Sequence, residues 1–171
     1  MSKKIGIVMG SDSDLPTMQE AVQILKDFDV AFDLHIISAH RSPERAHSYA
    51  VAAEQDYALV IAGAGGAAHL AGVIASFTPI PVIGVPMVTS GLGGLDSLLS
   101  MVQMPSGVPV PTMGIGKSGA INAALLAVQI LGVSDPKLRD KMNQYKKKLA
   151  DGVESKDLSV RNAMGLVPSV E

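Results

Sequence analysis

The chain has 171 residues, a formal net charge of −2 at pH 7 and no cysteine. This length favours a single domain with a core of its own, and the lack of cysteine excludes disulfide bonds and thiolate chemistry. Basic residues form a short cluster only at 146–148, so the sequence lacks the basic face that a nucleic-acid-binding protein needs.

Five apolar segments alternate along the chain with five stretches of helical periodicity. Residues 5–9 contain no polar position, which predicts a strand buried on both faces. Apolar residues then recur at helical spacing from 15 to 28. The expected later strands are 34–37, 58–62, 81–85 and 111–115, and the expected later helices are 43–55, 67–77, 94–102 and 119–131. This order predicts an α/β fold of three layers, α/β/α, with a five-stranded parallel, flavodoxin-like sheet.

The C-terminal part of the chain continues with an extra helix, expected over 136–152, that has Leu138, Met142 and Leu149 on one stripe. We expect residues 1–152 to form one α/β domain that includes this helix. Residues 153–171 are expected to form a tail. The sequence leaves open whether that tail is disordered or packs on a neighbouring subunit.

Small apolar side chains dominate the composition, with 47% apolar and only 4% aromatic residues. Glycine, proline or polar residues interrupt each apolar run well before the roughly 20 residues of a membrane-spanning helix, so we expect no membrane span. No basic and apolar signal segment precedes the first strand, and we expect a cytoplasmic location. The surplus of apolar surface indicates a homo-oligomer. The helix at 119–131, apolar nearly all round, favours a subunit contact over a central place in a monomer.

Polar loops follow three of the predicted strands, at the edge where open parallel sheets bind ligands. The first loop, 10–14, holds Ser11, Ser13 and Asp14 at a helix start. In one interpretation, Ser13 or Asp14 caps the helix by accepting hydrogen bonds from its free N–H groups ahead of Pro16. The loop can equally bind a phosphate and the hydroxyls of a sugar, and the sequence leaves both interpretations open.

The second loop, 38–43, places His40 beside Arg41. Histidine moves protons near neutral pH, and arginine binds phosphate or carboxylate through two parallel hydrogen bonds. A capping or surface role for the histidine is the alternative, but the grouping of these polar side chains at one strand end favours a functional site. His35 and His47 lie within a strand and a helix, and we assign them no role.

The third loop contains Gly63, Gly65 and Gly66 and ends in His69. Its small residues match the offsets of a dinucleotide-binding fingerprint, but that fingerprint follows the first strand and needs an acidic residue about 20 positions later. We therefore exclude nicotinamide binding. The glycines still indicate that backbone N–H groups of this loop can approach a ligand closely. Whether His69 faces that ligand or packs inside the protein stays open.

Other cofactor and catalytic motifs are absent from the sequence. The run Gly116, Lys117 and Ser118 resembles the end of an ATP-binding P-loop, but Pro111 stands where that motif requires glycine. The four histidines lack the short spacings that put two metal ligands on one face, and no serine lies in the nucleophile elbow of the hydrolases. We expect no metal, ATP or organic cofactor. Lys117 either brings a charge near the pocket or is a solvated loop lysine.

Six short motifs together identify a family. They are Gly-Ser-x-Ser-Asp at 10–14, Ser-Ala-His-Arg at 38–41, Gly-Ala-Gly-Gly-Ala-Ala-His-Leu at 63–70, Asp-Ser at 96–97, Gln-Met-Pro at 103–105 and Gly-Lys at 116–117. With them the chain resembles the class I 5-(carboxyamino)imidazole ribonucleotide mutases of bacterial purine synthesis. Arg41 and the glycine loop favour class I over a sister class in which lysine tends to follow the histidine. Two stretches, 71–73 and 88–92, depart from the family pattern, and we expect them to alter the pocket or a subunit contact.

The resemblance implies a reaction and roles for individual residues. The carboxylate on the exocyclic nitrogen would leave as carbon dioxide and be recaptured by the ring carbon, giving 5-amino-4-imidazolecarboxylate ribonucleotide for de novo purine (IMP) synthesis. His40 is implied as the general acid and base, and Ser11, Asp14 and Arg41 as substrate-binding residues. The further substrate-binding candidates are Ser13, Ser38, Gly63, Gly65, Gly66 and His69.

The resemblance also implies partners. Similar proteins form homo-octamers whose last helix reaches a neighbour, and an ATP-dependent carboxylase that makes the substrate would hand it over. Two other functions stay open. One is direct carboxylation of aminoimidazole ribonucleotide by free carbon dioxide, and the other is a non-catalytic module that binds a phosphorylated nucleotide. Such a module would not need His40, so this residue distinguishes an enzyme from a binding module.

Overall fold

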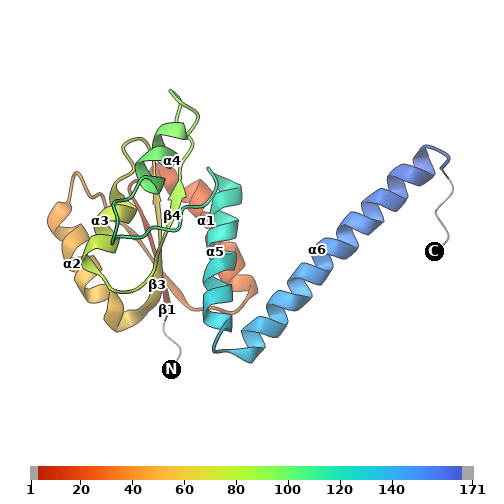
Figure 1. Ribbon diagram of the computed structural model, residues 1–171, viewed down its shortest axis with the longest axis horizontal. Coiled ribbons are helices and arrows are strands. Elements are labelled where there is room, and N and C mark those ends of the chain that lie inside the picture. The colour runs from red at the N-terminus through yellow and green to blue at the C-terminus, as the bar shows by residue number, and fades with distance from the viewer. Residues whose placement is uncertain (1–3, 167–171) are drawn as a thin grey trace. The chain divides into compact units, whose positions relative to one another are not determined.

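The structure, a computed structural model that describes residues 4–166, is built around a parallel sheet (Figure 1). Its four strands are β1 (Lys4–Met9), β2 (Phe32–Ile36), β3 (Tyr57–Ala64) and β4 (Val82–Pro86). They lie in the order β2-β1-β3-β4, and all three neighbouring pairs are parallel. β1, β3 and β4 are buried almost throughout, which explains their lack of polar alternation, whereas the edge strand β2 is only half-buried.

The fifth strand predicted at 111–115 is wrong. This segment runs beside β4 but makes only one isolated parallel bridge, between Gly84 and Thr112. The N–H of Gly84 donates to the carbonyl of Pro111, and the N–H of Met113 donates to the carbonyl of Gly84, both at 2.9 Å. Pro111 has no N–H of its own, so a regular ladder cannot extend through it. The sheet therefore has four strands instead of five.

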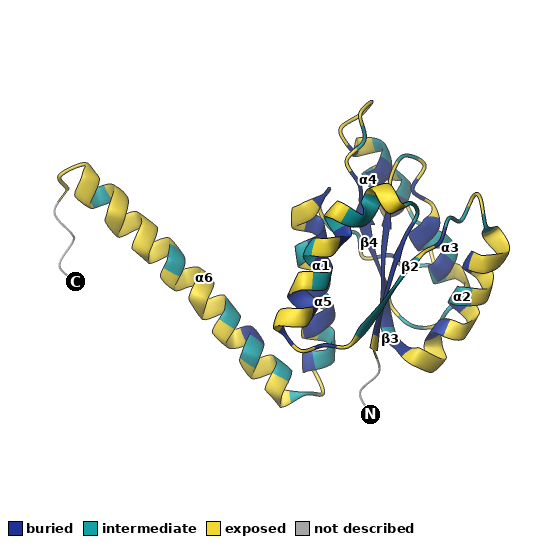
Figure 2. Ribbon diagram, turned by 180° about the vertical axis from the view of Figure 1, so that it is seen from behind, coloured by how far each residue is buried: buried dark blue, intermediate teal, exposed yellow. Residues whose placement is uncertain are grey.

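Helices cover both faces of the sheet, as Figures 1 and 2 show from opposite sides. α2 (Pro43–Asp56) and α3 (Leu70–Phe77) lie on one face, and α1 (Leu15–Asp27) and α5 (Lys117–Gly132) lie on the other. A short 3₁₀ helix, η1 (Asp12–Asp14), precedes α1, and α4 (Leu95–Val102) contacts β4. The α/β class with a parallel sheet between two helical layers is thus confirmed.

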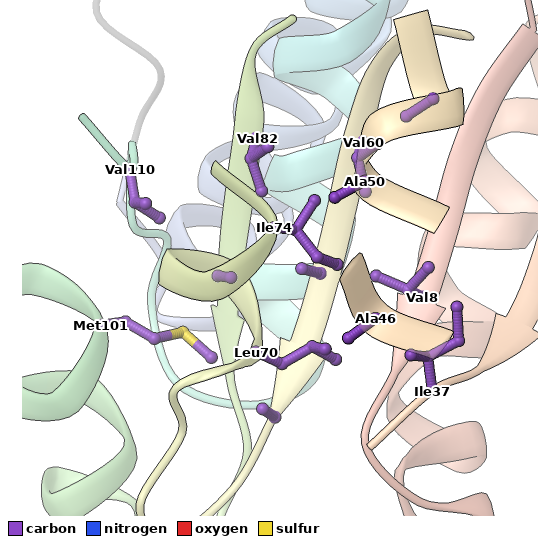
Figure 3. Packing of buried hydrophobic residues seen from close by; sticks show 14 of the residues in the cluster. Val8, Ile37, Ala46, Ala50, Val60, Leu70, Ile74, Val82, Met101 and Val110 are labelled. Atoms are coloured by element: carbon purple, nitrogen blue, oxygen red, sulfur yellow. The ribbon is translucent and has the colours of Figure 1, made fainter. Parts of the chain in front are cut away.

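Side chains alternate along the central strands and so supply two apolar layers. On the face of α2 and α3, Val8, Val60 and Val82 join a buried cluster with Leu70 and Ile74 (Figure 3). The intervening strand residues are also fully buried and point to the opposite face, toward α1 and α5; among them are Ile5, Ile7, Leu59, Ile61 and Ile83. The sheet is therefore covered on both sides, which fixes the positions of its strand ends.

The last helix, α6 (Pro136–Ala163), is longer than predicted. The side chain of Asp135 caps it by accepting from the N–H groups of Lys137 and Leu138, at 2.9 and 3.3 Å. The helix end expected at 152 is wrong, because the helix continues through residues expected to be tail, and the expected domain boundary falls inside it. Residues up to 131 form one compact unit and those from 132 a second. Residues 167–171 of the expected tail lie outside the described residues, and packing of this segment on a neighbouring subunit stays a prediction.

The strand order reverses between β1 and β3, because the chain proceeds from β1 to one side and then returns to the other. In open parallel sheets this reversal leaves a crevice at the carboxyl ends of the strands. The loops after β1 and β3 therefore flank the expected binding place. Within residues 4–166, no helix combines the length and the apolar character needed to cross a membrane.

Candidate active site

A cavity of about 570 Å³ opens at the carboxyl ends of the strands. The loops that follow all four strands contribute to its lining. Eight of the ten site residues expected from the sequence line it: Ser11, Ser13, Asp14, Ser38, His40, Arg41, Gly65 and His69. The three polar loops thus meet at one place, as the parallel sheet predicts.

The first loop is ordered by its own hydrogen bonds. Ser11 is the N-cap of η1, where its Oγ accepts from the N–H of Ser13 at 3.3 Å and its N–H donates to the carboxylate of Asp14 at 3.2 Å. This reciprocal pair is a capping box. The Ser13 hydroxyl also donates to the Ser11 hydroxyl at 2.9 Å. Capping does occur in this loop, but the cap is Ser11 instead of Ser13 or Asp14, and Asp14 makes no side-chain cap hydrogen bond at the start of α1. The side chains of Ser11, Ser13 and Asp14 also line the cavity.

Asp14 is half-buried in this loop. Burial raises the pKa of its carboxyl above the usual value for aspartate, because the charged form loses solvation. Hydrogen bonds from the backbone of Ser11 and from the Ser13 hydroxyl favour the charged form and offset part of the increase in pKa. The capping box therefore holds a carboxylate inside a cavity that would otherwise disfavour its charge.

The second loop fixes the guanidinium of Arg41 with neutral acceptors. Arg41 Nε donates to the Ser38 hydroxyl at 3.3 Å, and one terminal nitrogen donates to the carbonyl of Gly10 at 3.1 Å. The backbone N–H of Arg41 also donates to the Ser38 hydroxyl, at 3.2 Å. No carboxylate among the described residues pairs with this guanidinium. Its positive charge is therefore left for an anionic ligand.

The third loop brings a second imidazole to His40. The Nε2 atom of His40 lies 3.0 Å from Nδ1 of His69, and the two rings meet edge to face with their centroids 5.0 Å apart. One of the two nitrogens must carry the proton of this hydrogen bond. His69 therefore faces the cavity and its histidine partner, so the alternative of an internally packed His69 is excluded.

The glycines of the third loop have different positions. Gly65 lines the cavity, whereas Gly63 and Gly66 do not. Gly63 is buried at the end of β3, where an added Cβ would lie within 3 Å of Met18 and Met87 atoms. Gly66 has a positive φ of 69°, a conformation that favours glycine. A direct contact between substrate and Gly63 or Gly66 stays a prediction.

Sequence reasoning gave no role to two serines that hold the glycine loop. The Ser97 hydroxyl, fully buried, accepts from the N–H of Gly66 at 3.0 Å. The Ser100 hydroxyl shares its one proton between the carbonyl of Asp96 at 2.7 Å and the carbonyl of Gly66 at 3.2 Å. Ser97 belongs to one of the family motifs, which was the available signal. Its partner lies 31 residues away in the chain, so only the folded structure reveals the contact.

The loop after β4 also contributes to the cavity, through Met87, Val88 and Thr89. Two of these residues belong to the stretch 88–92 that departs from the family pattern, so this departure does reach the cavity. Lys117, by contrast, pairs with Glu20 at 2.8 Å and does not line the cavity. Among residues 4–166, no group of three histidine, aspartate or glutamate side chains could hold a metal ion.

Comparison with known proteins identifies relatives along most of the chain. The family model described as AIR carboxylase matches residues 4–152. The curated N5-carboxyaminoimidazole ribonucleotide mutase of Pyrococcus abyssi is 58% identical over 144 residues, which are 84% of this chain and 82% of that protein. The mutase of Mycobacterium tuberculosis (strain CDC 1551) is 52% identical over 163 residues, 95% of this chain and 92% of that protein. The crystal structure of Treponema denticola PurE superimposes with a TM-score of 0.84 at 27% identity, covering 93% of this chain and 99% of that one.

Proposed function

Because the chain belongs to the AIR carboxylase family, we infer that it catalyses the reaction named for its curated mutase relatives. It is an isomerase that moves the carboxylate of N5-carboxyaminoimidazole ribonucleotide from the exocyclic nitrogen to the ring carbon. The product is 5-amino-4-imidazolecarboxylate ribonucleotide, in purine biosynthesis. The observation that carries this conclusion is the joint lining of one cavity by the His40–His69 pair and an uncompensated Arg41.

We propose that Arg41 binds the anionic end of the substrate. Its guanidinium already has a fixed position, because Gly10 and Ser38 hold it, and its charge is not neutralised by a described carboxylate. Ser11, Ser13 and Asp14 offer hydroxyl and carboxylate groups for the ribose from the opposite loop. The aminoimidazole ring would then lie toward His40 and His69.

His40 is the proposed general acid and base. Its Nε2 is engaged by His69, and its Nδ1 has no hydrogen-bond partner among the described residues. Nδ1 is therefore the nitrogen that exchanges a proton with the substrate. As the bond between the exocyclic nitrogen and the carboxylate breaks, its electron pair stays on nitrogen, and Nδ1–H supplies the proton. The ring carbon then attacks the released carbon dioxide, and Nδ1 takes the proton that this carbon loses, which returns His40 to its starting state.

The released carbon dioxide must stay in the cavity until the ring carbon attacks it. The backbone around Gly65 and the side chains of Met87 and Val88 provide lining without a general base or nucleophile that would divert it. Exclusion of water would also strengthen the electrostatic interactions of Arg41. We propose that this part of the cavity is the wall that retains the carbon dioxide.

Two experiments test this reaction against its rivals. His40→Asn should lower kcat by roughly 100-fold or more, the usual contribution of a general acid and base, and retain binding of the product ribonucleotide. A normal rate would refute the role of His40 and would favour a binding module. Labelled bicarbonate supplied during turnover of unlabelled substrate should leave the product unlabelled. Heavy incorporation would support direct carboxylation by free carbon dioxide instead.

We also propose that the protein is a homo-oligomer, with the octamer as the expected size. α4 supports this, because Leu95, Leu99 and Val102 are each about half exposed and share one stripe of that helix. Sedimentation equilibrium would give the subunit number, and a monomeric mass would contradict the proposal. Receipt of the substrate from an ATP-dependent carboxylase and a cytoplasmic location stay predictions.

A further inference from the structure

The loop after β4 is held to α4 by one side chain, that of Thr89. Its hydroxyl accepts from the N–H of Gly94 at 3.1 Å and donates to the carboxylate of Asp96 at 2.7 Å. The carbonyl of Thr89 also accepts from the N–H of Gly93 at 3.0 Å. Gly94 is the N-cap of α4, Asp96 lies in the first turn, and neither of them lines the active-site cavity. The hydroxyl of Thr89 is therefore bound by groups that lie outside the cavity lining.

The methyl group of Thr89 has a different neighbour. A Cβ added at Gly65 would lie 3.8 Å from this methyl carbon, and Gly65 and Thr89 both line the cavity. A threonine side chain occupies staggered rotamers, and rotation between them can put the hydroxyl in the place of the methyl group. The hydrogen bond to Asp96 therefore decides which group of Thr89 faces Gly65.

The surroundings of that methyl group are largely apolar. A Cβ added at Gly65 would also lie 3.2 Å from Cβ of Met87, and Ala64 and Val88 line the cavity beside these two residues in the chain. This is the part of the cavity that we propose to retain carbon dioxide. A hydroxyl in place of the methyl group would offer a hydrogen bond to water at this wall. The orientation of Thr89 therefore determines whether this part of the wall is apolar.

We propose that Asp96 is a positioning residue, which holds the methyl group of Thr89 toward Gly65 and thereby keeps carbon dioxide in the cavity. This inference rests on the proposed function. It gives a role to the aspartate of the Asp-Ser motif at 96–97, which reaches the cavity through Thr89.

Loss of this positioning would let part of the carbon dioxide escape. The bond between the exocyclic nitrogen and the carboxylate breaks, its electron pair stays on nitrogen, and nitrogen takes the proton of His40. When carbon dioxide escapes, no bond forms at the ring carbon, that carbon keeps its proton, and His40 regains a proton from solvent. The escaped fraction is measured as the aminoimidazole ribonucleotide released per molecule of carboxylated product.

Asp96→Ala tests the positioning role. It should raise the escaped fraction by roughly 5- to 10-fold, the factor that about one hydrogen bond contributes to an equilibrium between rotamers. Asp135→Ala, which removes another half-buried carboxylate from the start of a helix, should leave the escaped fraction unchanged. An escaped fraction that Asp96→Ala does not change would overturn the proposal.

Two substitutions of Thr89 separate the positioning of a methyl group from a purely structural hydrogen bond. Thr89→Ser keeps the hydroxyl but lacks the methyl group, and it should raise the escaped fraction. Thr89→Val keeps the methyl group and should retain the wild-type escaped fraction, although the N–H of Gly94 loses its acceptor and stability falls. Because valine has methyl groups in both places, Asp96→Ala added to Thr89→Val should not raise the escaped fraction.

Thr112→Ser is the matched control, because Thr112 is also half-buried but lies outside the cavity lining. It should leave the escaped fraction unchanged. More escape from Thr89→Val than from Thr89→Ser would show that only the hydrogen bond of Thr89 matters, and this result would overturn the proposal.

A measurement that does not depend on the reaction separates failure of the positioning from failure of the proposed function. The methyl order parameter of Thr89, measured by NMR on the full chain, should be high in the wild type and in Asp135→Ala and should fall in Asp96→Ala. An unchanged order parameter in Asp96→Ala would refute the positioning even if the enzyme is active. A fall in a protein that does not convert the substrate would support the positioning and refute only the proposed reaction.

Discussion

Replacement of Ser97 by alanine should loosen the glycine loop without touching the cavity lining. Ser97 is fully buried, and its hydroxyl is the acceptor for the N–H of Gly66 at 3.0 Å. Alanine removes that acceptor, so the N–H of Gly66 is left without a hydrogen-bond partner in a part of the loop that is partly shielded from solvent. An unsatisfied buried donor costs about 1–3 kcal/mol, which corresponds to a fall in melting temperature of roughly 2–12 °C for a chain of this size. Gly66 would also move more freely, because the other described side chain at its backbone, that of Ser100, donates at the shorter distance to the carbonyl of Asp96.

The assay compares urea unfolding and steady-state kinetics of Ser97→Ala, wild type and Ser106→Ala at one protein concentration, because oligomerisation makes stability depend on concentration. Ser106 is exposed, and its hydroxyl makes no hydrogen bond with described residues, so it is the matched control. We expect Ser97→Ala to lose stability and to lower kcat/KM, with Ser106→Ala unchanged. Equal stability of the two variants would refute the reasoning that the Ser97 hydroxyl holds Gly66.

Three further predictions concern the core and the site. Gly6→Ala should destabilise by about 1–3 kcal/mol through overpacking, because its Cβ would overlap the Tyr49 hydroxyl, and adding Tyr49→Phe should recover part of the loss in urea unfolding. Asp14 has a raised pKa in the folded state, so its carboxyl takes up a proton on folding, and the stability of the protein should fall as pH rises through that pKa. The difference in free energy of unfolding between the wild type and Asp14→Asn, measured against pH, should therefore decrease as pH rises. His69→Phe should lower kcat by roughly 5- to 10-fold, the worth of about one hydrogen bond, and shift the pH profile of kcat. An unchanged profile would show that His69 does not act on His40.

The class of fold could be predicted from two local patterns in the sequence, the apolar runs and the helical spacing of apolar residues. Uniformly apolar runs became the buried strands β1, β3 and β4, and helical spacing predicted the layers on both sides. The segment at 111–115 looked like another strand because it is apolar and lies between predicted helices. It does run beside β4, but Pro111 interrupts the hydrogen-bond ladder, and this interruption depends on the backbone rather than on hydrophobicity.

The helix end predicted at 152 was wrong because a local preference was given too much weight. Gly152 and the polar residues after it favour termination, but glycine within a helix costs only about 1 kcal/mol relative to alanine. α6 continues to Ala163, with apolar side chains such as Val153 and Val160 exposed along it. A local preference of that size did not decide where the helix stops.

The candidate site was predictable as a group of loops, because parallel strands bring their carboxyl ends to one edge. Individual contacts were not. The 3.0 Å approach of His40 to His69 joins residues 29 positions apart, and nothing in either loop alone specifies it. The same holds for the contact between the Ser97 hydroxyl and the N–H of Gly66, two residues that lie 31 positions apart in the chain.

The capping box of Ser11 and Asp14 has a consequence for the thermodynamics of ligand binding. Its hydrogen bonds are complete in the free protein, so the loop is already rigid before a ligand arrives. Ordering a flexible side chain on binding costs about 0.5–1.5 kcal/mol, and this loop has that order in advance. The loop therefore loses its conformational entropy when the chain folds and not when the substrate binds. The hydroxyls and the carboxylate need not rearrange on binding.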